Sequence, residues 1–451
     1  MCPLRARGND GRTWIVRAGG RKGLPRAFSR LFVTVLIYVC LVACAQRSDP
    51  HTLTFWTIGR EGEAITQLLP DFERENPGIH VVLQQLPLTA AHQKLLTAFA
   101  GDSTPDMTQL GNTWLPELVA LGALEPLQTR VAGSHVVRPD DYFASIWSTN
   151  VYDSALYGVP WYVDTRLLFY RRDLLKAAGF DAPPRDWNEW RRMLAALSHP
   201  DRGVYGILLP TNEYEQLMSL ALEQPDPLLR DDGRYGNFES AGFKRALTFY
   251  VDTFRLHEAP PITNVEAGNP WVEFGRGVYS FYFSGPWNIG EFRKRLSPAD
   301  EAEWNTAPLP GPNGPGVSGA GGSSLVIFRK AAHKEAAWKL IEYLSRPDVQ
   351  SRFYDLLGDM PPRRSSWDLG SLRTDPKAQA FREQLERVKP TPPVPEWEQI
   401  VNEMQLVAAQ AVAGDLTIDQ AAAEMDRRAD RILEKRRWML DREHHAAGAT
   451  L

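Results

Sequence analysis

Tryptophan is frequent in this chain, with 14 among 451 residues. Five tryptophans stand in predicted loops or at predicted strand ends, where no apolar stripe accounts for them: Trp56, Trp114, Trp161, Trp271 and Trp287. A sugar has an apolar C–H face and a rim of hydroxyl groups, so its binding site needs flat aromatic surfaces together with hydrogen-bonding groups. These residues therefore favour carbohydrate binding, with a place in the core as the alternative for each.

Polar side chains accompany two of these rings. Glu61 begins a predicted helix shortly after Trp56 ends a predicted strand, and Asn112 lies beside Trp114 after another strand. Ligands of open α/β sheets bind at the carboxyl ends of the parallel strands. We therefore predict ligand contacts for all four residues. A glutamate at a helix start is equally well explained by the helix dipole, so both interpretations of Glu61 stay open.

The sequence lacks the motifs of common enzyme and nucleotide-binding classes. It contains no Gly-x-Ser-x-Gly and no His-Glu-x-x-His, and no cysteine follows Cys44. The glycine-rich stretch 319–322 precedes an apolar strand-like segment rather than a helix, which is the reverse of a phosphate-binding loop. The formal net charge is −4 and no basic stripe occurs, so nucleic acid is not an expected partner. We expect no catalytic residue, no cofactor and no metal.

The first 44 residues have the pattern of an export signal. Basic residues outnumber acids up to Arg30, and an apolar run from Leu31 to Ala43 follows, too short to cross a bilayer comfortably. Residues 41–44, Leu-Val-Ala-Cys, resemble the bacterial lipobox. We predict a signal peptide over residues 1–44 and a lipid-anchored periplasmic or cell-surface protein acylated at Cys44. A plain secretory signal is the alternative.

The segments that follow predict a parallel sheet covered by helices. Strand-like runs at 52–56, 79–83 and 105–110 alternate with helical stripes, one of which contains Ile65, Leu68 and Phe72. This order is typical of an α/β fold. The roughly 400 residues after the leader are enough for two or three domains.

Several short motifs, in their order and spacing, identify a family. They include residues 72–79 (Phe-Glu-Arg-Glu-Asn-Pro-Gly-Ile), 121–127 (Leu-Gly-Ala-Leu-Glu-Pro-Leu), 157–160 (Tyr-Gly-Val-Pro), 283–287 (Phe-Ser-Gly-Pro-Trp) and 307–310 (Ala-Pro-Leu-Pro). From about residue 52 to 433 the chain resembles the extracellular solute-binding proteins of family 1, which deliver sugars to ABC importers. Arg171 departs from the pattern, because the family usually has Asn or Asp there.

The resemblance implies a type II periplasmic-binding-protein fold, in which two α/β lobes close on a ligand in the cleft between them. Carried over, residues 45–162 and 307–349 form the N-terminal lobe, residues 163–306 and 350–440 form the C-terminal lobe, and residues 441–451 form a flexible tail. The stretches 160–166 and 305–310 are then the hinge strands.

The resemblance also implies further ligand contacts. Trp287 lies on the motif whose aromatic ring packs under a bound sugar, and Asp164 matches a sugar-contacting acid on the first hinge strand. Glu213 aligns loosely with another such acid. The remaining implied contacts are the backbone of Gly321 and Gly322 and the guanidinium of Arg363. The alternatives are a hinge role for Asp164 and an ion pair with a surface acid for Arg363.

The function implied is binding without chemistry. The protein captures a sugar, with the many aromatic rings favouring a disaccharide or oligosaccharide, and delivers it to an ABC permease and its ATPase. A monomer is expected. Three alternatives stay open: a secreted glycoside hydrolase, for which an acid pair at a suitable separation suffices; a protein binding another solute, such as a glycerol phosphodiester or a polyamine; and a scaffold that binds no ligand.

Overall fold

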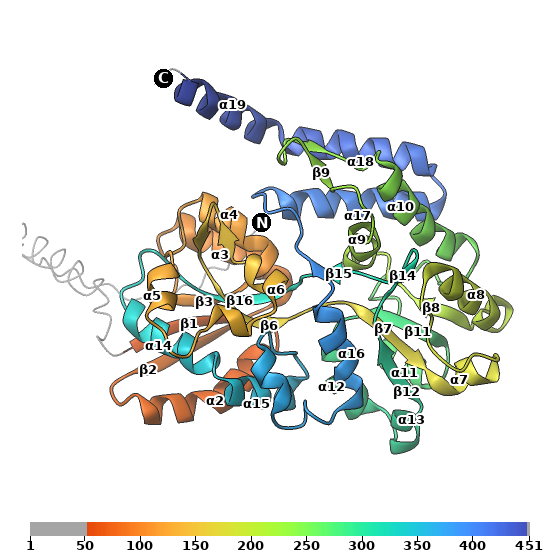
Figure 1. Ribbon diagram of the computed structural model, residues 1–451, viewed down its shortest axis with the longest axis horizontal. Coiled ribbons are helices and arrows are strands. Elements are labelled where there is room, and N and C mark those ends of the chain that lie inside the picture. Colours follow the sequence, from red (N-terminus) through yellow and green to blue (C-terminus); the bar gives the residue numbers. More distant parts are fainter. Residues whose placement is uncertain (1–51, 449–451) are drawn as a thin grey trace, which may run out of the picture. The chain divides into compact units, whose positions relative to one another are not determined.

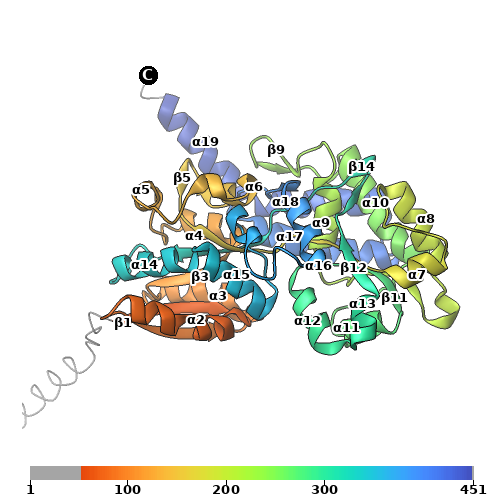
Figure 2. The same ribbon diagram turned by 60° about the horizontal axis from the view of Figure 1, so that its bottom comes forward.

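The computed structural model describes residues 52–448 (Figure 1). The predicted signal peptide and the lipidation site Cys44 lie outside the described residues. Within the described part, two β-sheets each organise a group of helices, here called the first lobe and the second lobe (Figures 1 and 2).

The first lobe is built on a five-stranded sheet with the order β2-β1-β3-β16-β6. Strands β1 (Thr52–Ile58), β2 (His80–Leu86) and β3 (Met107–Gly111) are parallel, and β16 (Gly322–Ile327) runs antiparallel between β3 and β6 (Val159–Val163). Alternate residues of β1, including Leu53 and Phe55, are fully buried, as the period of two predicts.

Helices cover both faces of this sheet. One face packs on α2 (Glu61–Glu75), α14 (Lys334–Leu344) and α15 (Pro347–Leu357), and the other packs on α3 (Leu88–Ala100) and α4 (Leu115–Ala120). Short elements complete the lobe: η1 (Asn112–Trp114), α5 (Gln128–Ala132), η2 (Pro139–Asp141), α6 (Ala144–Ser148), β4 (Val151–Tyr152) and β5 (Ala155–Leu156).

The second lobe is built on a four-stranded sheet with the order β12-β7-β11-β8. Strand β7 (Leu167–Arg171) runs antiparallel to β11 (Tyr279–Ser284) and β12 (Trp304–Ala307), while β8 (Tyr205–Leu208) is parallel to β11. Arg171 ends β7 with a buried side chain, whose Nη1 donates to the carbonyl oxygens of Phe274 and Gly275 and whose guanidinium pairs with Asp173. These partners accommodate the departure from the family pattern.

Two cores flank the second sheet. One is formed with α7 (Arg172–Ala177), α8 (Trp187–Leu197), α9 (Glu215–Leu222), α10 (Ala241–Arg255), α17 (Trp397–Ala413) and α18 (Ile418–Ile432). The other is formed with α11 (Pro270–Gly275), α12 (Trp287–Arg295) and α16 (Pro376–Leu385). The remaining elements are η3 (Pro200–Arg202), β9 (Leu229–Arg230), β10 (Tyr235–Gly236), α13 (Pro298–Ala302), η4 (Arg364–Asp368) and α19 (Glu434–Gly448).

The chain passes between the lobes at three places that lie side by side. The first crossing follows β6, where Val163 N donates to Met360 O at 2.9 Å and Asp164 N donates to Gly321 O at 3.0 Å. These bonds tie the first crossing to the other two, at residues 318–322 and 358–362. Strand β15 (Ser318–Gly319) also pairs with β17 (Val388–Lys389), which fastens the crossings to the C-terminal part of the chain.

The structure moves two of the predicted lobe boundaries. Residues 307–319 belong with the second lobe, because Ala307 and Leu309 lie in its core and the β13–β14 hairpin (Pro310–Gly311, Gly314–Pro315) precedes the crossing. The predicted hinge strand at 305–310 begins inside β12 of the second sheet, and the crossing lies further along the chain at residues 318–322.

The boundary predicted after residue 349 falls inside α15. This helix packs on the first lobe through Val349, Phe353 and Leu357, so residues 350–357 belong there. The predicted flexible tail at 441–451 begins within α19, which continues as a helix to Gly448. In the described part of the chain, no helix is both long and apolar enough to cross a membrane.

Candidate functional site

The site begins with a hydrogen-bonded group at the edge of the first sheet. Tyr162 on β6 donates from its hydroxyl to Glu61 Oε1 at 2.7 Å, and Gln109 Nε2 on β3 donates to Tyr162 Oη at 2.9 Å. Ser323 Oγ donates to the same tyrosine oxygen at 3.0 Å. Gln109 is held in turn by Ile58 N, which donates to its Oε1 at 2.8 Å. The strands of the first sheet thus fix the position of the Glu61 carboxyl.

Three acidic side chains gather where the crossings meet. Burial raises the pKa of Glu61 above its ordinary value. Burial and then the neighbouring Glu61 carboxyl raise the pKa of Asp359 well above its ordinary value. Burial also raises the pKa of Asp164 to about 6, with Arg166 opposing and Glu215 adding to the shift. A cluster of carboxyl groups that resist ionisation is a characteristic of functional sites.

Arg166 connects this cluster to the second lobe. Its Nη1 lies 3.2 Å from Asp164 Oδ1 and its Nη2 donates to Glu215 Oε1 at 2.8 Å, while the guanidinium lies 4.4 Å from the ring centroid of Trp287. Burial alone would lower the pKa of Arg166, but Asp164 and Glu215 raise it above its ordinary value. The arginine is therefore a fixed cation, and it holds Trp287 from one side.

Several buried polar atoms here lack a hydrogen-bond partner among the described residues. They are Arg166 Nε and Gln216 Oε1, together with Asp164 Oδ1 and Arg166 Nη1, which face each other as an ion pair without a hydrogen bond. Gln216 Nε2 donates to Glu213 Oε2 at 2.5 Å. The Oε1 atom of Gln216 therefore lies beside Glu213, a predicted site residue. Buried polar groups in native proteins nearly always have partners, so such a concentration marks a place where a polar ligand would bind.

The aromatic part of the site lies at the edge of the first lobe. Trp56 and Trp114 both pack on the small cluster of Ile58, Leu86 and Ala91, and the Trp114 ring lies 4.9 Å from that of His92. Both tryptophans are only partly buried. Both rings are therefore partly accessible at the edge of the first lobe, and their contact with a sugar stays a prediction.

Glu398 of α17 joins the two lobes beside Trp114. Burial raises the pKa of its carboxyl, and the neighbouring side chains of Thr113 and Trp114 oppose this. The Glu215 carboxyl of the second lobe lies close enough to raise it further. The Glu398 carboxyl therefore lies near both Trp114 of the first lobe and Glu215 of the second.

Two predicted glycines lie on the second crossing, and Asn112 contacts this crossing from the loop after β3. The carbonyl oxygen of Gly321 accepts from Asp164 N, and a Cβ on Gly322 would lie 2.3 Å from Tyr162 O, so both glycines let the crossings approach one another. Asn112 is buried and its Nδ2 donates to Ala320 O at 2.6 Å. The amide therefore fastens the loop after β3 to the second crossing.

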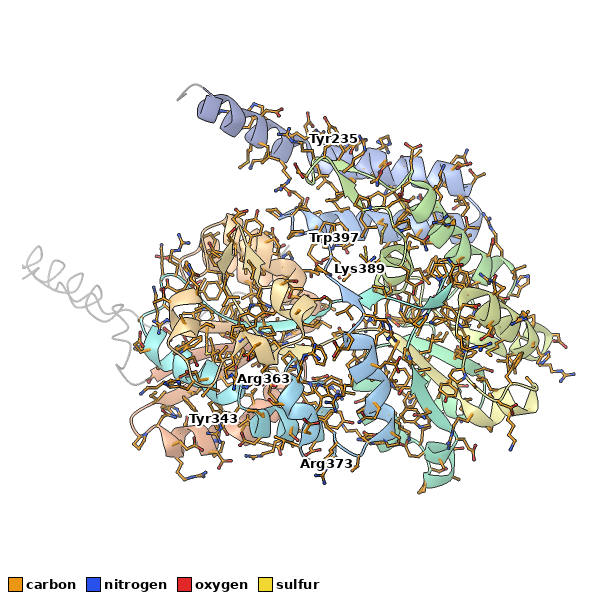
Figure 3. All side chains as sticks on the ribbon, viewed as in Figure 1. Tyr235, Tyr343, Arg363, Arg373, Lys389 and Trp397 are labelled. Atoms are coloured by element: carbon orange, nitrogen blue, oxygen red, sulfur yellow. The ribbon has the colours of Figure 1, made fainter. Side chains whose placement is uncertain are left out.

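Arg363 lies apart from the site, contrary to the prediction. Figure 3 labels Arg363 among the elements of the first lobe. Its guanidinium is buried, with Nε donating to Asp141 Oδ2 at 2.7 Å and Nη1 to Ser345 O at 2.5 Å. All of these partners belong to the body of the first lobe. The alternative prediction for Arg363 was an ion pair with a surface acid. Arg363 does form an ion pair, with Asp141, but the pair is buried.

The sequence interpretation missed several groups of this site. They are Gln109, Tyr162, Arg166, Glu215, Asp359 and Glu398. Two of them carried a signal that could have placed them in the site. Arg166 follows Asp164 by two residues, so it lies on the same face of an extended hinge strand. Asp359 follows Gly358, which ends α15 at a crossing with a positive φ of 89°. Among the other early tryptophan candidates, Trp161 is a core residue, 2% exposed.

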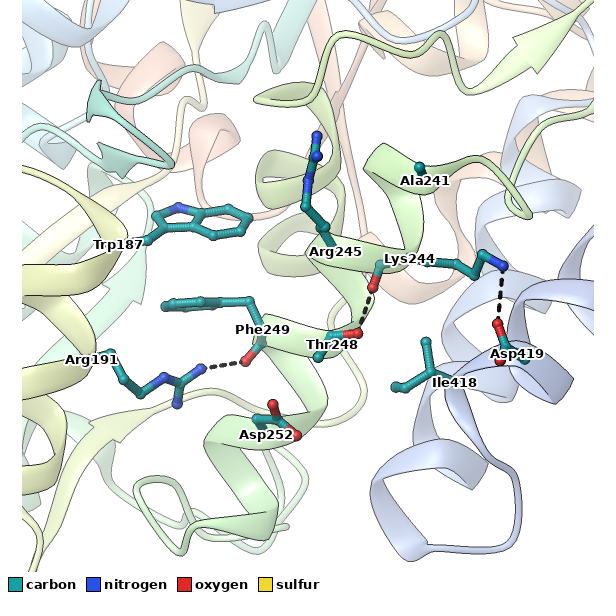
Figure 4. Close-up of a pocket in the computed structure, with 10 residues that line it drawn as sticks. All are labelled: Trp187, Arg191, Ala241, Lys244, Arg245, Thr248, Phe249, Asp252, Ile418 and Asp419. Atoms are coloured by element: carbon teal, nitrogen blue, oxygen red, sulfur yellow. Dashed lines mark hydrogen bonds and ion pairs between the residues drawn. The ribbon is translucent and has the colours of Figure 1, made fainter.

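A second concave region lies on the second lobe, away from this group. It has a volume of about 670 Å³ and is bordered by α8, α10 and the start of α18 (Figure 4). Its cations have protein partners, since Lys244 pairs with Asp419 and Arg191 donates to the carbonyl oxygen of Phe249. We therefore place the functional site at the crossings and not in this pocket. The described residues contain no cluster of His, Cys, Asp and Glu suited to a metal ion.

Comparison with known proteins identifies the family. The model of the bacterial extracellular solute-binding proteins matches residues 56–351. The sugar-binding protein MalE of Xanthomonas citri is 55% identical, with a TM-score of 0.83 over 86% of this chain and 99% of that one. The mannitol-binding protein of Pseudomonas aeruginosa is 24% identical over 86% of this chain and 94% of its own length. The diacetylchitobiose binding protein of Streptomyces coelicolor is 22% identical, over 81% and 88% respectively.

The chain therefore belongs to the bacterial extracellular solute-binding protein family. This confirms the predicted two-lobed periplasmic-binding-protein fold and the predicted role as the substrate-binding component of an ABC importer. The family is one of binding proteins and not of enzymes, so the prediction of binding without chemistry is also confirmed. The family acts outside the cytoplasmic membrane, which agrees with the predicted compartment.

Proposed function

We propose that this protein binds a sugar, a disaccharide or an oligosaccharide, between its two lobes and delivers it to an ABC permease and its ATPase. The buried polar atoms that lack a hydrogen bond, at the first crossing and on the neighbouring helix α9, carry the proposal. Asp164 Oδ1 and Gln216 Oε1 are acceptors and Arg166 Nε is a donor, which together suit hydroxyl groups that both donate and accept. The names of the relatives from X. citri and S. coelicolor, which refer to sugars, support this choice of ligand.

The proposed contacts come from both lobes. Glu61, Trp56 and Trp114 would contact the sugar from the first lobe, and Glu213 and Trp287 from the second. At the crossings, Asp164 would accept from its hydroxyl groups, while Gly321, Gly322 and Asn112 would shape the backbone there. A ligand that touches both lobes stabilises the closed arrangement through contacts that an open one cannot make.

Export and anchoring complete the proposal. The predicted signal peptide and the lipobox-like residues 41–44 support attachment of the folded part to a membrane through acylated Cys44, with the protein acting as a monomer. The seven residues 45–51 between Cys44 and β1 would then connect the anchor to the first lobe.

Thermal unfolding of residues 45–451 against a panel of sugars tests the proposal. A sugar present at a hundred times its Kd should raise the unfolding free energy by about 2.7 kcal/mol, and it should be recovered intact. Glycerol phosphodiesters and polyamines serve as comparison ligands. Stabilisation by one of these and by none of the sugars would contradict the proposal, and so would recovery of a cleaved sugar.

A further inference from the structure

Among its described side chains, those that hold helix α19 to the second lobe lie on one face. Arg437 donates from Nη1 to Arg234 O at 2.9 Å and from Nη2 to Asp430 O at 2.7 Å, and its guanidinium lies 4.7 Å from the ring centroid of Tyr235. One turn further on, Asp441 pairs with Arg234 at 2.5 Å. These contacts fix the rotation of the helix about its own axis.

The opposite side of α19, called here the outer face, has a different composition. It consists of Lys435, Trp438, Met439 and Arg442, which the helical spacing of three, four and seven residues places on one side. All four are exposed, with Trp438 at 57% and Met439 at 46%, and the Arg442 guanidinium lies 4.7 Å from the Trp438 ring centroid. Two large apolar side chains thus stand between two cations.

The charges of the outer face are not neutralised. Among the described residues, no carboxylate lies within ion-pair distance of Lys435 or Arg442, nor of the exposed Arg431 one turn earlier. The chain as a whole carries a formal charge of −4, so this is a local positive surface on an acidic protein. Its attraction to an anionic partner would therefore come from its own residues and not from the bulk charge.

The position of α19 leaves this face accessible. The helix extends away from α17 and α18 at the C-terminal end of the described chain (Figures 1 and 2). None of the proposed sugar contacts belongs to α19, so its outer face could be occupied while a sugar is bound between the lobes.

The chemistry of this face fits a lipid surface. A tryptophan ring is amphipathic and settles at the boundary between headgroups and acyl chains, where methionine can also be buried. Lysine and arginine on the same helical face reach anionic headgroups while their aliphatic stems stay in apolar surroundings. We propose that the outer face of α19 docks on an anionic phospholipid surface. The contact adds to any attachment through Cys44, and it does not depend on which solute is bound.

Flotation of residues 45–451 with vesicles tests the proposal. The vesicles contain phosphatidylglycerol and phosphatidylethanolamine, and vesicles of phosphatidylcholine serve as the neutral reference. The protein should float with the anionic vesicles at low salt and should be released at 0.5 M salt, where the Debye length falls to about 4 Å. The double variant Lys435→Glu with Arg442→Glu should reduce the bound fraction at least about tenfold, since each cation near an anionic bilayer contributes to binding.

Two further variants separate charge from apolar contact. Trp438→Ala keeps every charge, and we expect it to weaken binding several-fold. The matched control is Lys176→Glu with Arg202→Glu, which makes the same change of charge at exposed positions of the second lobe and should bind as the unaltered chain does. Melting temperature and the sugar-induced shift should be unchanged in all variants, so failure of this proposal is distinguishable from failure of the proposed sugar binding.

Three results would overturn the inference. The first is equal flotation with anionic and neutral vesicles, and the second is equal loss of binding in the control variant. The third is a concentration-dependent dimer that Trp438→Ala dissociates, because the outer face would then be covered by a second copy of this chain.

Discussion

Asp164 illustrates how one residue can serve both the hinge and the ligand. Its backbone N–H joins two crossings, while its side chain pairs with Arg166 and retains an oxygen without a hydrogen bond. Burial raises the pKa of Asp164, and the neighbouring carboxyl groups of Glu215 and Glu213 raise it further. The guanidinium of Arg166 opposes this shift but does not cancel it. The Asp164 carboxyl should therefore gain or lose its proton near pH 6.

Sugar binding should consequently depend on pH. The pKa of Asp164 is raised to about 6, so below this pH the free protein holds a proton that must leave before the carboxylate can accept from sugar hydroxyls. Affinity should then fall by up to about tenfold per pH unit as pH decreases from 6 towards 4. Calorimetric titration with sugar between pH 4.5 and 8 measures this change in affinity.

The variant Asp164→Asn provides the control for this dependence. Its amide oxygen still accepts a hydrogen bond but cannot be protonated in this range. It should bind more weakly at pH 8 and with a flat pH profile. A profile as steep as that of the unaltered chain would assign the titration to another acid of the cluster, such as Glu61 or Asp359.

At the scale of elements, the hinge depends on a close approach of backbones. Gly322 has a φ of 144°, and a Cβ there would lie 2.3 Å from Tyr162 O and 3.0 Å from Val163 Cα. Both the backbone conformation and the contact exclude a side chain. The second crossing can therefore lie against β6 only because this position is glycine.

Gly322→Ala should destabilise the protein by about 1–3 kcal/mol and weaken sugar binding, since Ser323 and Tyr162 would shift. Gly314 is a matched control, because its φ of 148° is nearly the same but nothing lies within 4 Å of a Cβ there. Gly314→Ala should cost less and leave sugar affinity unchanged. Urea unfolding and calorimetry measure both effects. If the two substitutions had equal effects, the close contact would not be the cause.

The sequence predicted the regular elements better than the irregular crossings. The alternation of Thr52 to Ile58 and the apolar spacing of α2 are strong local signals, and both elements are found where they were expected. Strands β13 to β15 contain two residues each, which is too short for any periodicity, and the second crossing was consequently placed too early.

Site residues were predictable only where a motif or a strand end marked them. Asp164 and Glu61 belong to the carboxyl cluster at the crossings and Trp287 lies against Arg166, whereas Arg363 lies in the body of the first lobe. A motif position does not reveal whether a guanidinium is buried against an acid such as Asp141. Glu398 could not be found from the sequence, because it reaches Trp114 only after α17 has folded across from the second lobe.

At the scale of the whole molecule, an ion pair that involves none of the proposed sugar contacts links the lobes. Arg60 at the start of α2 pairs with Glu291 on α12, which is 5% exposed and also binds Arg295. Because the two partners belong to different lobes, their attraction contributes only when the lobes are closed. The pair should therefore favour the closed arrangement even without a ligand.

Removing this pair should weaken sugar binding indirectly. When the binding-competent arrangement is less populated, the apparent Kd rises in proportion. Arg60 is partly exposed, which limits the coupling to roughly 1 kcal/mol or less, so Glu291→Gln should raise the Kd by about two- to fivefold. Small-angle scattering of the sugar-free variant should show a larger radius of gyration, and the sugar-bound form should match that of the unaltered chain.

A double-mutant cycle with Arg60→Gln separates the pair from other effects, because Arg60 also lies close to Glu61. The double variant should be no weaker than the worse single variant. Glu273→Gln is the control, since Glu273 pairs with Arg276 within the second lobe and should not alter Kd or radius. Strictly additive losses in the cycle would show that the two charges act separately, in which case the ligand itself, and not a contact between the lobes, determines closure.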